Sequence, residues 1–121
     1  MVFRRNPLRS LRLVACLNIF DEGLSEVVKN LSSLEELQIY FCNITHAGLE
    51  FVGRHCPGLK SLTFNQNGMF HEYESENEEA FAIARSMPEL RHLSLFENPM
   101  SNNGLQVILD SCHHLESLDI R

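Results

Sequence analysis

Four cysteines and six histidines are the residues of this sequence with the most versatile side-chain chemistry. Two cysteines can form a disulfide, and cysteines combined with histidines can bind zinc. The densest cluster of these residues is Cys112, His113 and His114, but no second pair of ligands stands at a suitable spacing. Two interpretations remain: a metal site at this cluster, which is the weaker one, and structural free thiols. Free buried thiols would favour a reducing compartment, the cytosol or the nucleus.

A serine, a histidine and an acid also occur together, on neighbouring segments, at His92, Ser94 and Asp119. This combination is common on polar sheets, and nothing nearby supplies an oxyanion hole. The sequence also lacks a glycine-rich phosphate loop and a pair of acids placed for catalysis. We therefore expect neither an enzyme nor a bound cofactor or metal.

The cysteines belong to a pattern that repeats along the whole chain. Cys16 and Cys42 each lie eight residues after the first leucine of a Leu-x-x-Leu-x-(Leu/Ile/Phe) motif, and Asn67 and Asn98 take that place in later copies. The motif occurs five times, and its first leucines are Leu8, Leu34, Leu59, Leu90 and Leu115. Their separations are 26, 25, 31 and 25 residues. A period in this range indicates a repeat built of one strand, one turn and one helix.

The repeat gives each cysteine a structural role. Cys56 and Cys112 share a position with Leu31 and Met87, which predicts a buried apolar slot. The position that accepts either cysteine or asparagine is the inner turn, where a small side chain can bond to loop backbone groups.

Stacked repeats of this kind bury a continuous core between a parallel sheet and a row of helices. The predicted fold is therefore α/β, a leucine-rich-repeat solenoid of the ribonuclease-inhibitor-like type. It has a concave sheet, convex helices and about four and a half repeats. We expect residues 1–121 to form a single repeat domain, uncapped at both ends.

Composition narrows the partners and the location of the protein. The net charge is −6 and the pI is about 5.4, which argues against nucleic acid. No apolar run approaches the roughly 18 residues of a membrane helix, and no signal peptide is recognised. We therefore expect a cytoplasmic or nuclear protein without a membrane partner.

The helix boundaries and buried faces follow from capping residues and apolar spacing. The predicted N-caps are Asp21, Thr45, Asn77 and Ser101. The residues expected to face the core are Val27, Val28 and Leu31, then Ala80, Phe81 and Ala84, then Ile108, Leu109 and Cys112.

Two surfaces are candidates for partner binding. The concave face carries Tyr40 and Phe96 in one column, with Gln38 and His92 beside them, and exposed aromatics are enriched at binding hot spots. The second is the acidic insertion at residues 68–76, which makes the third copy longer and carries Phe70 and Tyr73. Each has a simpler alternative, because a single exposed aromatic is normal and an inserted loop can be merely solvated.

Residues 42–59, C-N-I-T-H-A-G-L-E-F-V-G-R-H-C-P-G-L, resemble the cysteine-containing leucine-rich repeat of F-box proteins. Residues 104–121 resemble plant F-box/LRR-repeat proteins in particular, and the resemblance covers nearly the whole chain. It departs from the family at His46 and Asn102, where an acidic residue is usual. In that family an F-box docks the Skp adaptor of a cullin-based ubiquitin ligase, and the repeats hold the protein to be ubiquitinated.

The resemblance implies a protein-interaction module that recognises the substrate of a ubiquitin ligase. No F-box is present in the sequence, the first repeat starts at Leu8, and the last residue, Arg121, falls in a predicted strand. We therefore expect a segment of a longer array, whose open ends could self-associate and which would not bind the Skp adaptor. The alternative is a binding or scaffold protein unrelated to ubiquitin, such as an intracellular inhibitor or an immune-receptor repeat.

Overall fold

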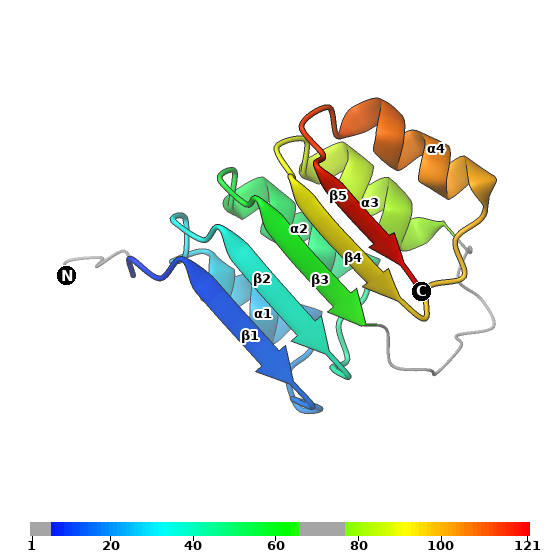
Figure 1. The fold of residues 1–121 in the computed structure, drawn as a ribbon. Helices are drawn as coiled ribbons and strands as arrows, with labels where there is room; N and C mark the ends of the chain where they lie inside the picture. Colours follow the sequence, from blue (N-terminus) through cyan, green and yellow to red (C-terminus); the bar gives the residue numbers. More distant parts are fainter. Residues whose placement is uncertain (1–5, 66–76) are drawn as a thin grey trace.

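The computed structural model describes residues 6–65 and 77–121. In these residues strands and helices alternate from one end of the chain to the other (Figure 1). The elements are β1 (Ser10–Val14), α1 (Asp21–Val28), β2 (Glu36–Tyr40), α2 (His46–His55), β3 (Ser61–Asn65), α3 (Glu78–Ser86), β4 (His92–Phe96), α4 (Asn102–Ser111) and β5 (Ser117–Ile120). The predicted alternation of strand and helix is confirmed.

The five strands form one parallel sheet in chain order, β1-β2-β3-β4-β5. The pairing keeps the repeat register, so that Leu37 stands opposite Leu11 and Leu62. The four helices of the described residues lie against one face of this sheet, and none of them lies on the other face, which we call the open face (Figure 1). The first and last strands, β1 and β5, lie at opposite ends of the stack (Figure 1).

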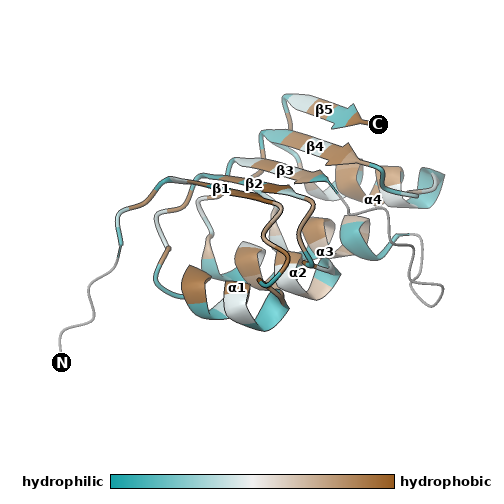
Figure 2. Ribbon diagram, turned by 90° about the horizontal axis from the view of Figure 1, so that it is seen from below, coloured by the Kyte–Doolittle hydropathy of each residue, from teal (hydrophilic) through white to brown (hydrophobic). Residues whose placement is uncertain are grey.

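The core lies between the sheet and the helices, where the motif leucines meet the apolar side of each helix (Figure 2). Leu37, Leu62 and Leu93 expose at most 1% of their surface. Alternate strand residues point to opposite faces, which places the polar residues between these leucines on the open face. The predicted apolar slot is also confirmed, because Leu31, Cys56, Met87 and Cys112 are all buried.

Three of the strands end in the same tight turn. Ala15, Phe41 and Glu97 directly follow β1, β2 and β4, and their φ angles are 54°, 56° and 55°. This left-handed conformation is uncommon for residues other than glycine. The turn thus recurs at one repeat position with three different residue types.

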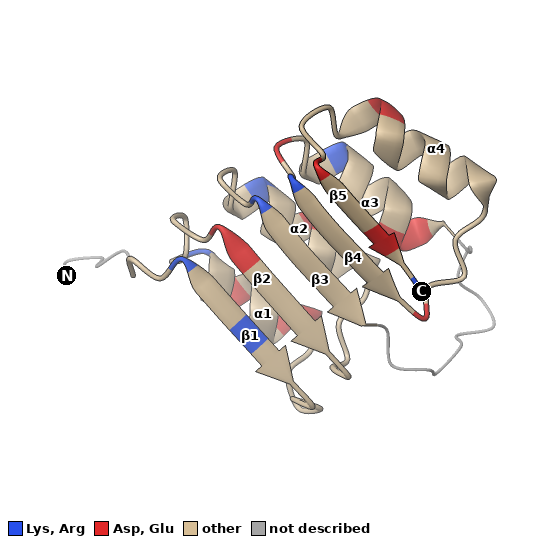
Figure 3. Ribbon diagram, viewed as in Figure 1, with Lys and Arg blue, Asp and Glu red and all other residues tan. Residues whose placement is uncertain are grey.

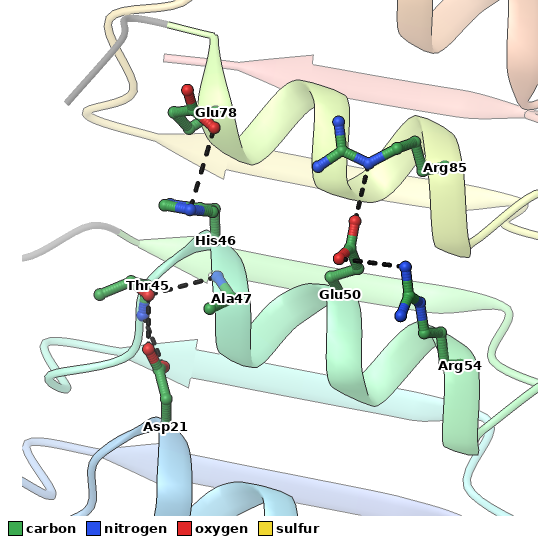
Figure 4. Close-up of polar contacts among 8 residues, drawn as sticks. All are labelled: Asp21, Thr45, His46, Ala47, Glu50, Arg54, Glu78 and Arg85. Carbon is green, nitrogen blue, oxygen red and sulfur yellow. Dashed lines mark hydrogen bonds and ion pairs between the residues drawn. The ribbon is translucent and has the colours of Figure 1, made fainter.

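The prediction of Asp21 as an N-cap is wrong. Phe20 occupies the cap position of α1, and Asp21 is the first residue of the helix. The Asp21 carboxylate instead accepts hydrogen bonds from the backbone N–H and the hydroxyl of Thr45 in the next repeat (Figure 4). Thr45 is the N-cap of α2 as predicted, and its hydroxyl accepts from the Ala47 N–H at 3.2 Å.

The same link recurs between the third and fourth repeats. Asn77 stands ten residues before Met87, as Asp21 stands ten before Leu31, and it forms two hydrogen bonds with Ser101. Asn77 and Ser101 occupy the cap positions predicted for them, although neither has a side-chain cap bond to its own helix. The polar residues at the helix starts therefore join consecutive repeats.

Four residues predicted to face the core do not do so fully. Val27 and Leu109 are 51% and 50% exposed, and Phe81 and Ala84 are only half-buried. The repeat explains why Val27 is exposed. Val52, Ile83 and Ile108 occupy its position in later copies and are fully buried. Within residues 6–65 and 77–121, no helix lies on the outer side of Val27 or of Leu109 to cover it. In α3 the buried side instead carries Ala80, Ala82 and Ile83.

No helix within residues 6–65 and 77–121 is long and apolar enough to cross a membrane.

Candidate functional site

The open face of the sheet is organised in rows that cross the strands. The row at the strand ends contains Val14, Tyr40, Asn65 and Phe96, aligned by the parallel register. Hydrogen bonds continue the ladder to Arg121, whose N–H donates to the carbonyl of Leu95 at 2.9 Å. The predicted column of Tyr40 and Phe96 therefore exists, with Asn65 between the two rings.

An arginine lies over each of the two aromatic rings. The guanidinium of Arg12 is 5.3 Å from the centre of the Tyr40 ring, and that of Arg121 is 5.5 Å from the centre of the Phe96 ring. Both distances fall within the range of cation–π attraction. Both arginine side chains lie on the same face of the sheet as the rings. From the sequence we considered exposed aromatic residues, and we did not predict a role for either arginine.

Tyr40 is also held by a chain of side-chain hydrogen bonds along β2. Its hydroxyl donates to Gln38 Oε1 at 3.3 Å, and Gln38 Nε2 donates to Glu36 Oε1 at 3.3 Å. The hydroxyl of Ser10 on β1 donates to the same Glu36 oxygen at 2.8 Å. Gln38, a predicted partner-binding residue, thus positions Tyr40.

On the other side of the face, His92 does not assemble with Ser94 and Asp119. His92 Nδ1 is 2.7 Å from the hydroxyl of Ser117, and Asp119 forms an ion pair with Arg121 at 3.1 Å. His92 is exposed. Within the described residues, His92 is therefore a polar residue at the edge of the open face, in contact with Ser117.

Charge on the open face is confined to its two sides. The central strands β3 and β4 contain no lysine, arginine, aspartate or glutamate (Figure 3). Arg12 and Glu36 lie on one side of them, and Asp119 and Arg121 on the other. The face thus has a neutral centre with aromatic residues and charged borders.

A second polar cluster lies on the helices, where α2 and α3 meet. The Glu50 carboxylate is 2.7 Å from Arg85 Nε and 3.3 Å from Arg54 Nη2 (Figure 4). The hydrogen bond from Arg85 lowers the pKa of Glu50 below its usual value. His46 Nε2 lies 3.8 Å from the Glu78 carboxylate on the same side. The contacts of Glu50 with Arg85 and of His46 with Glu78 link neighbouring repeats, whereas the contact with Arg54 lies within α2.

All four cysteines are free thiols, and three are buried. The thiols of Cys16 and Cys42 lie 3.6 and 3.4 Å from the carbonyls of Val14 and Tyr40, which confirms the predicted bonding in the inner turn. Burial raises the pKa of Cys42 and Cys112, and it raises that of Cys56 to about 11. Cys56 and Cys112, whose shifts have burial as their sole cause, are therefore poor nucleophiles at neutral pH.

The structure thus brings four of the six predicted partner-binding residues, Tyr40, Phe96, Gln38 and His92, to one face. The other two, Phe70 and Tyr73, lie outside the described residues.

Comparison with known proteins identifies similar sequences and a similar fold. Residues 87–109 match the leucine-rich-repeat family. The chain is 44% identical over 119 residues to F-box/LRR-repeat protein 23 of Arabidopsis thaliana, covering 98% of this chain and 26% of that protein. It is 43% identical over 118 residues to the F-box protein SKIP19 of the same plant, covering 98% of this chain and 37% of that protein.

A solved structure shows the same fold. A chain in the crystal structure of the yeast Rad7 and Elc1 complex superposes with a TM-score of 0.69 over 97% of this chain and 29% of that one. The two are 21% identical, so the likeness concerns the fold. The chain described here therefore has a leucine-rich-repeat fold. It spans only 26% and 37% of the lengths of the two Arabidopsis proteins just named.

Proposed function

We propose that this leucine-rich-repeat chain, a homologue of plant F-box/LRR-repeat proteins over nearly its whole length, binds a protein partner through the open face of its sheet. More specifically, we propose that this partner is the substrate of a cullin-based ubiquitin ligase. The homologous region of the relatives is their repeat region, which supports a role in binding rather than in catalysis.

The observation that carries the proposal is the arrangement of the open face. Tyr40 and Phe96 stand two strands apart in one row, each beneath an arginine, and β3 between them is uncharged. The centres of protein interfaces are depleted of charge, and aromatic residues and arginine are enriched there. The charged side chains at both sides of the face would form the polar rim of such an interface.

The size of the face limits the affinity that it can provide. Five strands about 4.8 Å apart make a sheet roughly 20 Å wide, with about fifteen outward side chains. A standard stable interface uses about 20–30 residues on each partner. The 121 residues would therefore carry part of a binding surface and bind the partner weakly.

Binding to the Skp adaptor is not expected of these residues, because the resemblance assigns that role to the F-box. An isolated 121-residue chain would then compete with a full-length ligase for the substrate without recruiting the ligase. Such a protein would act in the cytosol or the nucleus.

Affinity capture from a plant extract tests this proposal, with the purified adaptor added in a parallel reaction. The Tyr40→Ala/Phe96→Ala variant should lose most of the captured proteins, by about tenfold or more. A matched control is Val27→Ala/Leu109→Ala, which removes two exposed apolar side chains from helices and should retain them. Adaptor bound by residues 1–121 would contradict the proposal, as would equal capture by the two double variants.

The insertion at residues 68–76 remains a second predicted contact. A Phe70→Ala/Tyr73→Ala variant in the same capture experiment separates its contribution from that of the open face. The alternative of a scaffold unrelated to ubiquitin is distinguished by sequencing the parent transcript, where an upstream F-box is expected.

A further inference from the structure

Two thiols occupy the same place in the first two repeats. Cys16 and Cys42 each follow a residue in the left-handed conformation, Ala15 or Phe41. Each thiol points to the carbonyl two residues earlier in the chain, at 3.6 and 3.4 Å. The local backbone and the side-chain direction of the two cysteines therefore match.

The register of β1 and β2 leads directly to both cysteines. Val14 pairs with Tyr40, and the N–H of Ala15 donates to the Tyr40 carbonyl at 2.8 Å. Val14 and Tyr40 are 26 positions apart, which is also the separation of Cys16 and Cys42. Beyond the cysteines the backbone register changes, because Phe20 bridges Asn43, although the Asn43 side chain still donates to the Leu17 carbonyl at 2.7 Å. The two cysteines therefore lie opposite one another at about the spacing of parallel neighbours, ~4.8 Å. Disulfides span Cα separations of about 4.4–6.8 Å.

The other two cysteines provide an internal contrast. Cys56 and Cys112 share the slot before the next strand, but they belong to the second and fourth repeats. The thiol of Cys56 lies 3.3 Å from the Leu31 carbonyl, and that of Cys112 lies 3.5 Å from the Met87 carbonyl. Met87 fills the same slot in the repeat between them, so these two thiols are two repeat spacings apart.

We propose that Cys16 and Cys42 are an oxidisable dithiol, which hydrogen peroxide converts to a disulfide joining the first two repeats. The Cys16 sulfur attacks one peroxide oxygen, the O–O bond breaks, and Cys16 sulfenic acid and one water form. The Cys42 sulfur then attacks the Cys16 sulfur, the S–S bond forms, and a second water leaves. Both thiol protons end in water, and one peroxide is reduced for each disulfide.

The burial of the two thiols sets the order of these steps. Cys16 is half-buried, whereas Cys42 is 4% exposed, so peroxide reaches Cys16 first. Burial raises the pKa of Cys42, while a hydrogen bond from the Cys16 backbone opposes the rise and contact with the Cys16 thiol adds to it. Closure of the disulfide should therefore speed up as the pH rises, because the thiolate is the attacking form.

The disulfide would act beside the open face. It removes the S–H groups that face the carbonyls of Val14 and Tyr40, and it fixes β1 to β2 beside the Arg12 and Tyr40 pair. The inference does not rest on the proposed function, since the thiols lie opposite each other whatever the face binds.

The chain offers a direct test, because each cysteine falls in a different tryptic peptide: residues 13–29, 30–54, 55–60 and 92–121. The Cys56→Ala/Cys112→Ala variant, folded by circular dichroism, is treated with one equivalent of hydrogen peroxide. Its intact mass should fall by two hydrogen atoms. Digestion without reductant should yield peptide 13–29 linked to peptide 30–54. If the double variant does not fold, the wild-type chain is oxidised instead and should yield the same linked peptides.

A matched control is Cys16→Ala/Cys112→Ala, which keeps two thiols that do not face each other and should not lose two hydrogens. Sulfinic acid on Cys16 with Cys42 still a free thiol would overturn the inference. Linkage between two copies of the chain would also overturn it, as would an equal yield of the 13–29/30–54 link when the chain is oxidised in urea.

Discussion

Burial of a single leucine shows how tightly the stack depends on its register. Leu37, the second residue of β2, has no exposed surface and stands between Leu11 and Leu62 of the flanking strands. Leu37→Ala should therefore lower the free energy of unfolding by about 2–5 kcal/mol, the usual cost of lost burial and a cavity. Denaturant melts of both proteins measure this difference.

The matched control is Leu17→Ala, which removes the same atoms from a side chain that is 52% exposed. It should change the free energy of unfolding by less than about 0.5 kcal/mol. If Leu37→Ala and Leu17→Ala lowered the free energy of unfolding equally, the predicted burial of Leu37 would be contradicted.

At the level of the helices, glycine at the third helical position lets adjacent repeats meet. A Cβ atom at Gly48 would lie 2.3 Å from Asp21 Oδ1, and one at Gly104 would lie 2.4 Å from Asn77 Oδ1. These oxygens belong to the side chains that bond to Thr45 and Ser101 of the following repeats. Glycine at the third position of α2 and of α4 thus leaves room for the polar side chain of the preceding repeat.

This requirement predicts opposite effects for one substitution at two equivalent positions. Gly48→Ala should lower the free energy of unfolding by about 1–3 kcal/mol through overpacking against Asp21. Gly23 is also the third residue of its helix, and a Cβ atom added there would meet no other atom within 4 Å. Gly23→Ala should raise the free energy of unfolding by roughly 0.5–1 kcal/mol, because alanine is the better helix former. Thermal melts test this prediction. It would be contradicted if Gly48→Ala and Gly23→Ala shifted the melting temperature in the same direction.

The contact between α2 and α3 predicts a dependence on pH. The pKa of Glu50 is lowered in the folded state by the Arg85 hydrogen bond. Its stabilisation is therefore present above the unfolded pKa, about 4.3, and is lost as the pH falls through the lower folded pKa. At neutral pH Glu50→Gln should cost on the order of 1 kcal/mol.

Denaturant melts at a series of pH values measure this difference. The gap between wild type and Glu50→Gln should close as the pH falls toward about 3. Glu116→Gln is a suitable control, because its ion pair with Arg91 is longer, at 3.9 Å, and more than half exposed on both sides. A gap that stays constant with pH would show that Glu50 contributes through packing alone.

At the scale of the whole stack, the described residues expose apolar side chains on the first and last helices. Val27 and Leu109 are exposed at positions that neighbouring repeats bury, and β1 and β5 are the outermost strands of the described sheet. Such faces and edges favour association. The 121-residue chain should therefore self-associate as its concentration rises.

Light scattering over a concentration series tests this expectation. Val27→Ser/Leu109→Ser, or an added polar capping repeat, should shift the chain toward monomer, whereas Leu17→Ser, away from the helix faces, should not. A wild-type chain that remains monomeric at high concentration would contradict the prediction.

The sequence determined the repeat and the elements that it builds. Five spaced leucine motifs fixed the positions of the strands, because burial of one sheet face requires apolar residues at every second place. The same motifs placed Tyr40 and Phe96 in one row and put Cys56 and Cys112 in a buried slot. These features depend on short-range periodicity, which a sequence records directly.

Only the tertiary structure decided how neighbouring repeats meet. Asp21 carries the signal of an N-cap, yet its carboxylate bonds to Thr45, 24 residues away. Val27 has the spacing of a core residue, but its burial depends on a repeat on its outer side. Arg12 and Arg121 cover the aromatic rings only because the register places them there. Such contacts depend on how one repeat is set against the next, and periodicity within a single repeat contains no information about the neighbour that completes them.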